Sequence, residues 1–139
     1  HPGWTERDPD RMWNAAAEAI REVLDIAGRS PGDVAAVSVA GYGSGLYLVD
    51  RNGDPVRPGI VSTDSRAAGL VAEWAAAGLT DQVEPLIQQR IWPAQTLVLL
   101  GWIQRHEPAV MQRTHRVLFC KDFLRCRLCG DFSTDPARI

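Results

Sequence analysis

The spacing of apolar and polar residues over positions 8–31 predicts one long amphipathic helix. Asp8 supplies a side-chain acceptor for the first turn, and the fixed φ of Pro9 suits the position after it. Gly28 and Pro31 mark the end of the helix. The apolar positions fall on one helical face, at Met12, Ala16, Ile20, Val23, Leu24 and Ala27.

A buried strand and a hairpin are predicted next. Residues 34–40, VAAVSVA, form a short apolar run that is rich in β-branched side chains and bounded by turn residues, as in an interior strand. Residues 45–50 and 55–61 flank Asn52-Gly53, a common hairpin turn. The glycine-rich stretch AGYGSG, residues 40–45, therefore joins the strand to the hairpin.

The rest of the chain predicts mainly helices. Helical composition or caps mark SRAAGLVAEWAAAG ending at Gly78, TLVLLGWIQRHE, PAVMQRT opening at Pro108, and FLRCRL between a capping Asp122 and Gly130. The run RVLFC predicts another interior strand. Helices that alternate with strands indicate an α/β fold, with a sheet covered by helices.

Composition excludes several classes of partner. The 139 residues fit one domain or a large piece of one, and a formal charge of -2 lacks the basic excess that nucleic-acid binding needs. The apolar run LVLLGWI is too short to span a bilayer, and the first ten residues contain no signal-peptide core. We therefore expect a cytoplasmic protein with neither nucleic acid nor membrane as partner.

Three cysteines lie close together near the end of the chain. Their odd number favours reduced thiols. The C-x-x-C spacing of Cys126 and Cys129 is compatible with a zinc site or a redox pair, but no second ligand pair follows at a suitable spacing. We expect Cys120, Cys126 and Cys129 to be thiols on or beside a short helix, and we predict no metal site.

The glycines of AGYGSG do not form a nucleotide-binding motif. A dinucleotide fingerprint needs G-x-G-x-x-G at the start of a helix, and a P-loop needs a terminal Gly-Lys-Ser/Thr. Two interpretations stay open. Gly41, Gly43 and Gly45, with Tyr42 and Ser44, would let a hydroxyl-rich ligand approach the main chain, or the glycines would only form a bend.

Residues 62–67, STDSRA, form a second candidate at the far end of the hairpin. If strand and hairpin pack together, Thr63, Asp64 and Arg66 would offer polar groups to a polyol. Alternatively, Asp64 or Ser62 caps the following helix, and Arg66 is an ordinary exposed side chain.

Three stretches together resemble the FGGY family of carbohydrate kinases. They are GWTERDPDRMW at residues 3–13, the strand, turn and hairpin at 34–67, and residues 106–135, which contain Lys-Asp-Phe-Leu-Arg and a final Thr-Asp. The resemblance implies part of the first of two ribonuclease-H-like domains of the actin and sugar-kinase type. It also implies that ATP and Mg²⁺ bind mostly outside this segment, since the family's Asp-Gly-Thr phosphate loop would precede residue 1 and its catalytic base belongs to the second domain.

The resemblance also implies a substrate site. Gly43 and Ser44 stand where glycerol-specific members have Arg-Glu and xylulose-specific members often Met-His, and Ser62 stands where many members have a Trp. The Ser-Thr-Asp-x-Arg form looks closest to L-xylulose and erythritol kinases. The predicted substrate-binding residues are Tyr42, Gly43, Ser44, Ser62, Thr63, Asp64 and Arg66.

The predicted function is the substrate-binding part of an ATP-dependent kinase that phosphorylates a pentulose or polyol. Residues 1–139 would be a partial N-terminal domain, inactive alone and without a catalytic residue of its own. A non-catalytic sugar-binding or regulatory module on the same fold is the alternative, and a purely structural interaction domain is a third. The partner is a small sugar or polyol, with a second copy in a homodimer left open.

Overall fold

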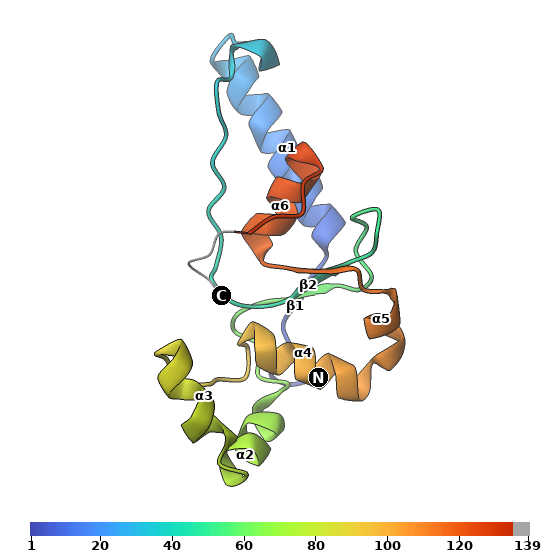
Figure 1. Ribbon diagram of the computed structural model, residues 1–139. Coiled ribbons are helices and arrows are strands. Elements are labelled where there is room, and N and C mark those ends of the chain that lie inside the picture. The colour runs from blue at the N-terminus through green and yellow to red at the C-terminus, as the bar shows by residue number, and fades with distance from the viewer. Residues whose placement is uncertain (135–139) are drawn as a thin grey trace.

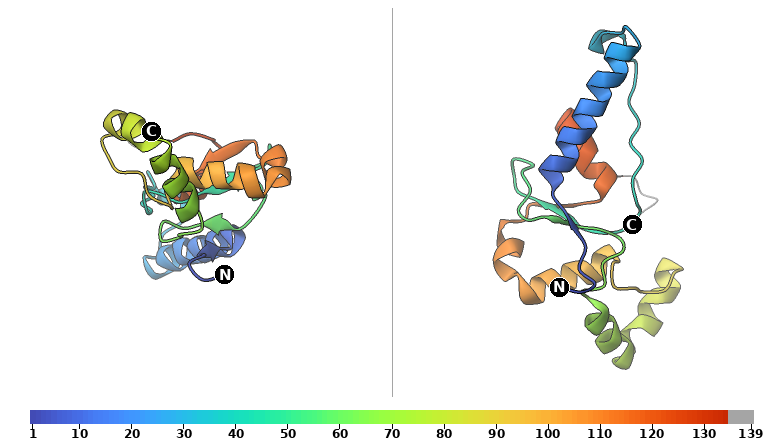
Figure 2. Two further views of the ribbon diagram at one scale, coloured as in Figure 1. Left: turned by 90° about the horizontal axis from the view of Figure 1, so that it is seen from below. Right: turned by 180° about the vertical axis from the view of Figure 1, so that it is seen from behind.

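A computed structural model describes residues 1–134 and shows short strands between two groups of helices (Figure 1). Helices α1 (Pro9–Ile26) and α6 (Cys120–Cys129) lie on one side. Helices α2 (Ala68–Ala76), α3 (Leu79–Ile87), α4 (Thr96–His106) and α5 (Pro108–Arg113) lie on the other, as the view from behind in Figure 2 also shows. The predicted α/β arrangement is confirmed.

Strand β2 (Tyr47–Val49) divides the core in two, because successive side chains of a strand point to opposite faces. Leu46 and Leu48 pack with buried residues of α2 and α4. Tyr47 and Val49 pack on the other face with β4 and α6. The chain that follows the glycine turn is therefore fixed by two separate clusters.

The strands form two antiparallel pairs joined by the hairpin. Strand β1 (Glu6–Arg7) pairs with β3 (Gly59–Ile60), and β2 pairs with β4 (Arg116–Leu118). Single bridges from Leu46 to Ile60 and from Val49 to Pro55 close the hairpin between them. The predicted hairpin is confirmed. In its turn, Asp50 Oδ1 accepts hydrogen bonds from Asn52 N at 2.8 Å and Asp54 N at 3.0 Å.

The first predicted helix is confirmed as α1, but only its beginning is well packed. Asp8 is the N-cap residue and accepts hydrogen bonds from the amides of Asp10 and Arg11. Ala17 is buried, whereas Val23 and Ile26, in the last turn, are 64% and 80% exposed. A short 3-10 helix, Pro31–Asp33, follows.

The predicted strand at residues 34–40 is wrong. The segment runs as an extended trace near α1 and α6, and no strand among residues 1–134 pairs with it (Figure 1). Val37 is 57% exposed. The physical reason is that a strand exists only through hydrogen bonds to a neighbour, and the local pattern cannot supply that neighbour.

For most of the remaining elements the predicted type is correct, but the predicted bounds differ from the observed ones. Helix α2 ends before Gly78, which has φ +71°. Helix α3 was not predicted; it contains Pro85, which ordinarily interrupts a helix. Helices α4 and α5 are confirmed, and so is β4, although Arg116 and Val117 of β4 are exposed.

Helix α6 begins before its predicted cap. Asp122 lies inside the helix, and its Oδ2 accepts a hydrogen bond from Phe119 N at 3.2 Å. The helix is followed by Gly130, with φ +72°, as predicted. Its buried Cys120 and Cys126 and exposed Cys129 are free thiols. Separately, none of the helices within residues 1–134 combines the length and apolar character that a bilayer span requires.

Candidate functional site

The glycine turn, residues 41–45, is held against the end of the hairpin and the start of α4. Gly45 has φ +99°, and a Cβ atom built on it would lie 2.5 Å from the carbonyl oxygen of Ile60. Gly45 N donates to Ala94 O at 3.1 Å, and Thr96 Oγ1 donates to Gly45 O at 2.9 Å. Gly45 is therefore required by the fold itself, as the bend interpretation expected for at least this position.

The Tyr42 side chain links the glycine turn to the core. Its hydroxyl is hydrogen-bonded to that of buried Tyr47, whose ring stacks on Phe123 with centroids 5.7 Å apart. Burial raises the pKa of Tyr42 to about 12, so its phenol is neutral at physiological pH. The Tyr42 side chain thus anchors the turn to the core cluster, and its hydroxyl is already engaged within the protein.

The structure brings the turn and the end of the hairpin together. The Cβ position of Gly45 is 3.4 Å from Ser62 N, although the two residues are well separated in sequence. Gly43, Ser44 and Ser62 are half-buried, and Thr63 is exposed. Ser44, Ser62 and Thr63 offer hydroxyl groups, which can donate to and accept from a polyhydroxylated ligand, and Gly43 adds no side-chain volume.

Asp64 and Arg66 form a buried ion pair that faces the N-terminal segment. Asp64 is 3% exposed. Its Oδ1 accepts hydrogen bonds from Arg66 N at 2.8 Å and Arg66 Nε at 2.9 Å, while its Oδ2 accepts from Thr5 N at 2.6 Å and Arg66 Nη2 at 2.9 Å. Burial alone raises the pKa of a carboxyl, but hydrogen bonds from Arg66 and Thr5 outweigh it and lower the pKa of Asp64.

Both structural alternatives for this pair therefore fail. The N-cap residue of α2 is Ala67, which has no side-chain cap, so neither Asp64 nor Ser62 caps the helix. Arg66 is not an exposed side chain, since its side chain is fully buried. Its guanidinium lies 4.2 Å from the centroid of the Trp4 ring, and Arg66 Nη1 lies 2.8 Å from Glu6 Oε1.

A wider ion network surrounds this pair. Arg57 is ion-paired with Glu6 of β1, and Arg57 Nη1 lies 3.2 Å from Glu107 Oε1, just before α5. The Arg57 side chain is only 7% exposed. Sequence reasoning missed this network, because its members are far apart along the chain and nothing local marks them.

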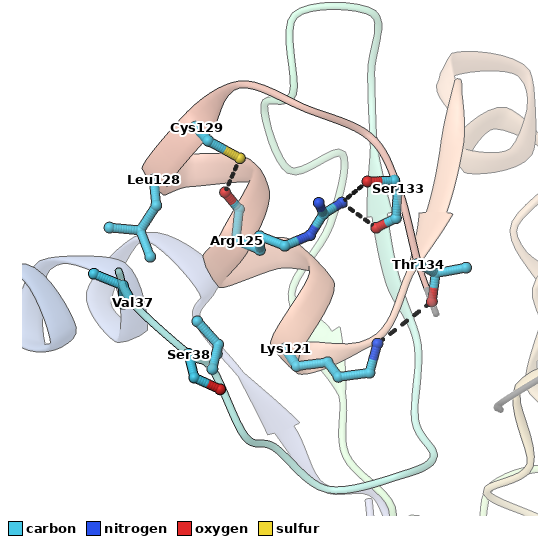
Figure 3. Close-up of a pocket in the computed structure, with 9 residues that line it drawn as sticks. Val37, Ser38, Lys121, Arg125, Leu128, Cys129, Ser133 and Thr134 are labelled. Carbon is cyan, nitrogen blue, oxygen red and sulfur yellow. Dashed lines mark hydrogen bonds between the residues drawn. The ribbon is translucent and has the colours of Figure 1, made fainter. Parts of the chain in front are cut away.

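A hollow of about 640 Å³ lies elsewhere, between the extended segment and α6 (Figure 3). Val37 and Leu128 line its apolar side. Two cations also line it, but Arg125 is hydrogen-bonded to Ser133, and Lys121 Nζ lies 3.4 Å from Thr134 Oγ1. No predicted substrate-binding residue lines this hollow.

The sequence matches the N-terminal domain of the FGGY family of carbohydrate kinases over residues 1–139. This match includes residues 106–135, the last of the three stretches that carry the resemblance, although Asp135 lies outside the described residues. A probable L-xylulose kinase of Pasteurella multocida is 32% identical over 137 residues, which are 99% of this chain and 28% of the relative. The L-xylulose/3-keto-L-gulonate kinase of Escherichia coli is 33% identical over 138 residues, with the same coverage. The chain thus spans little more than a quarter of the length of these curated relatives.

Solved structures show the same fold. The xylulose kinase from Rhodospirillum rubrum matches with a TM-score of 0.83 and 28% identity, over 97% of this chain and 28% of that one. The Plasmodium falciparum glycerol kinase with ADP matches with a TM-score of 0.78 and 20% identity, over 94% of this chain and 27% of that one, which supports the fold alone.

Proposed function

This chain belongs to the FGGY family of carbohydrate kinases, and we propose that it is the substrate-binding part of an ATP-dependent kinase that phosphorylates a hydroxyl of a pentulose or polyol. Its fold is that of the family's N-terminal domain, of the ribonuclease-H-like, actin and sugar-kinase type. The observation that carries the proposal is the meeting of the glycine turn with Ser62. The relatives named for L-xylulose and xylulose support a pentulose as the preferred substrate.

The predicted site residues divide into two roles. Ser44, Ser62 and Thr63 have the small side chains and hydroxyl groups that would contact a sugar, and Gly43 leaves space beside them. Tyr42, Asp64 and Arg66 already have their polar groups engaged by the protein, and we propose that they hold the wall of the site.

The chain's contribution to the reaction would be positioning. Holding an acceptor hydroxyl in line with a phosphoryl donor can lower a barrier by ~7 kcal/mol or more. When bound, ATP with Mg²⁺ supplies the phosphoryl group and offsets its charge. Within residues 1–134, no group of three or more His, Cys, Asp or Glu side chains is placed to hold a metal ion, so we assign Mg²⁺ to none of them.

We further propose that residues 1–139 are one part of a larger N-terminal domain, as the coverage of the relatives suggests. The exposed Val37 and the exposed apolar end of α1, at Val23 and Ile26, are surfaces on which the rest of that domain would pack. A cytoplasmic location and a homodimer remain predictions.

The test is a phosphoryl-transfer assay on the full-length protein. We would measure ADP release with Mg-ATP and a panel of L-xylulose, D-xylulose and erythritol. We expect turnover of at least one of them, and Ser44→Trp should raise the KM for that sugar at least tenfold by filling the site, with no change in Tm. Sugar binding without turnover of any panel member would instead establish a non-catalytic sugar-binding module.

A further inference from the structure

The side-chain oxygen of Gln95 is buried and accepts no hydrogen bond from the described residues. The residue as a whole is 9% exposed, and the oxygen concerned is Oε1. It is the N-cap residue of α4, yet its side chain makes no capping hydrogen bond. Buried acceptors in proteins are usually hydrogen-bonded, so this oxygen is available to a donor from a bound molecule, either water or a ligand.

The two neighbours of Gln95 both hold the glycine turn. Ala94 O accepts the hydrogen bond from Gly45 N at 3.1 Å, and Thr96 Oγ1 donates to Gly45 O at 2.9 Å. The backbone of Gln95 is therefore fixed between two contacts to Gly45. Because the Cβ position of Gly45 is 3.4 Å from Ser62 N, Gln95 and the hairpin end flank the same glycine.

We propose that Gln95 is a specificity-determining residue of this site, whose amide oxygen accepts a hydrogen bond from one hydroxyl of the sugar. The proposal rests on the proposed function. A sugar hydroxyl is a donor of the kind that the buried oxygen lacks. A site built around such a bond rejects an analogue without the hydroxyl, because the protein's polar group then stays unpaired.

The experiment compares two Gln→Met variants of the full-length protein. Gln95→Met keeps an unbranched side chain of similar length but removes the acceptor. Gln104→Met is the matched control, since Gln104 is an exposed residue of the same helix. Steady-state kinetics with Mg-ATP and the panel of L-xylulose, D-xylulose and erythritol are measured together with Tm, in the absence and presence of each sugar.

We expect Gln95→Met to raise the KM of the preferred sugar at least tenfold, while the KM of ATP stays unchanged. Without sugar, its Tm should equal or exceed that of the wild type, because an unpaired buried acceptor has been removed, and the sugar-induced rise in Tm should disappear. Gln104→Met should behave as the wild type. A purely structural role for Gln95 would lower the sugar-free Tm and leave the sugar KM unchanged, which would overturn the proposal.

Two further outcomes distinguish failure of the role of Gln95 from failure of the proposed function. Wild-type turnover of a panel sugar with an unchanged KM in Gln95→Met refutes the role of Gln95 alone. If the wild type neither binds nor phosphorylates any panel sugar, the proposed function fails and this inference fails with it. Should Gln95→Met not fold, Gln95→Asn, which withdraws the acceptor by one methylene, should raise the sugar KM in the same direction, and a wild-type KM in that variant overturns the proposal.

Discussion

Removing the Asp64 carboxylate should destabilise the protein strongly. In Asp64→Ala, the amide of Thr5 loses its acceptor, and among the described residues the fully buried Arg66 side chain keeps Glu6 as its only ion-pair partner. Removing one partner of a buried ion pair costs ~3–5 kcal/mol of unfolding free energy. Because Glu6 remains as a partner, we expect the lower end of that range, ~3 kcal/mol.

The assay is urea unfolding of the full-length protein followed by tryptophan fluorescence, with Trp4 beside Arg66 as a local reporter. Glu18→Ala, at an exposed position in the middle of α1, is the control and should change the unfolding free energy by less than ~0.5 kcal/mol. A loss below ~1 kcal/mol in Asp64→Ala, or a loss equal to that of the control, would refute the buried-pair reasoning.

The same pair has a defined pH dependence. The pKa of Asp64 is lower in the folded protein than its ordinary value, so the unfolded chain binds a proton more readily. Its contribution to stability is therefore complete above the ordinary pKa of about 4 and is lost as the pH falls through the lowered folded-state pKa. The difference between wild type and Asp64→Ala should be constant near neutrality and shrink only in that acidic window.

Two other variants or reagents test the turn and the core. Gly45→Ala should lower the unfolding free energy in urea by at least ~2 kcal/mol, because the φ of +99° at Gly45 and the nearby β3 carbonyl both oppose a Cβ atom. The control Gly69→Ala, at an uncrowded position of α2, should raise it by ~0.5–1 kcal/mol. An unchanged unfolding free energy in Gly45→Ala would show that the turn is not constrained. A thiol reagent should modify exposed Cys129 of the native protein first, and buried Cys120 and Cys126 only on unfolding. Burial also raises the pKa of Cys126, which lowers its reactivity further. Labelling rates are measured by mass spectrometry of the labelled peptides, and equal rates for the three thiols would contradict the packing of α6.

The elements that the sequence predicts well are those with local causes. Helix α1 follows from a cap and a spacing that are both contained in residues 8–31, and the hairpin follows from its Asn-Gly turn. Residues 34–40 have the composition of a strand but depend on a neighbour that no local pattern reveals. Helix α3 was missed for the opposite reason, because Pro85 argues against a helix that tertiary contacts with α2 support.

The candidate site shows the same division. The sequence identified Asp64 and Arg66 as noteworthy, yet their partners Thr5, Glu6 and Trp4 are about sixty positions away, so their roles could not be derived from spacing. Gln95 carries no signal in the sequence at all. Its significance depends on a hydrogen bond that is not made, which only coordinates can show.

The distribution of charge bears on the kind of substrate that the turn would accept. The ionised side chains at the hairpin end, Asp64 and Arg66, neutralise each other in a buried pair, and Arg57 is ion-paired with two glutamates. The groups proposed to contact a ligand at the turn are neutral. They are the hydroxyls of Ser44, Ser62 and Thr63 and the amide of Gln95. Neutral donors and acceptors bind uncharged hydroxyls without the desolvation cost of an unpaired ion. On the proposed function, this part of the site is thus suited to the uncharged polyhydroxyl end of a sugar, and any anionic group must be bound by other parts of the protein.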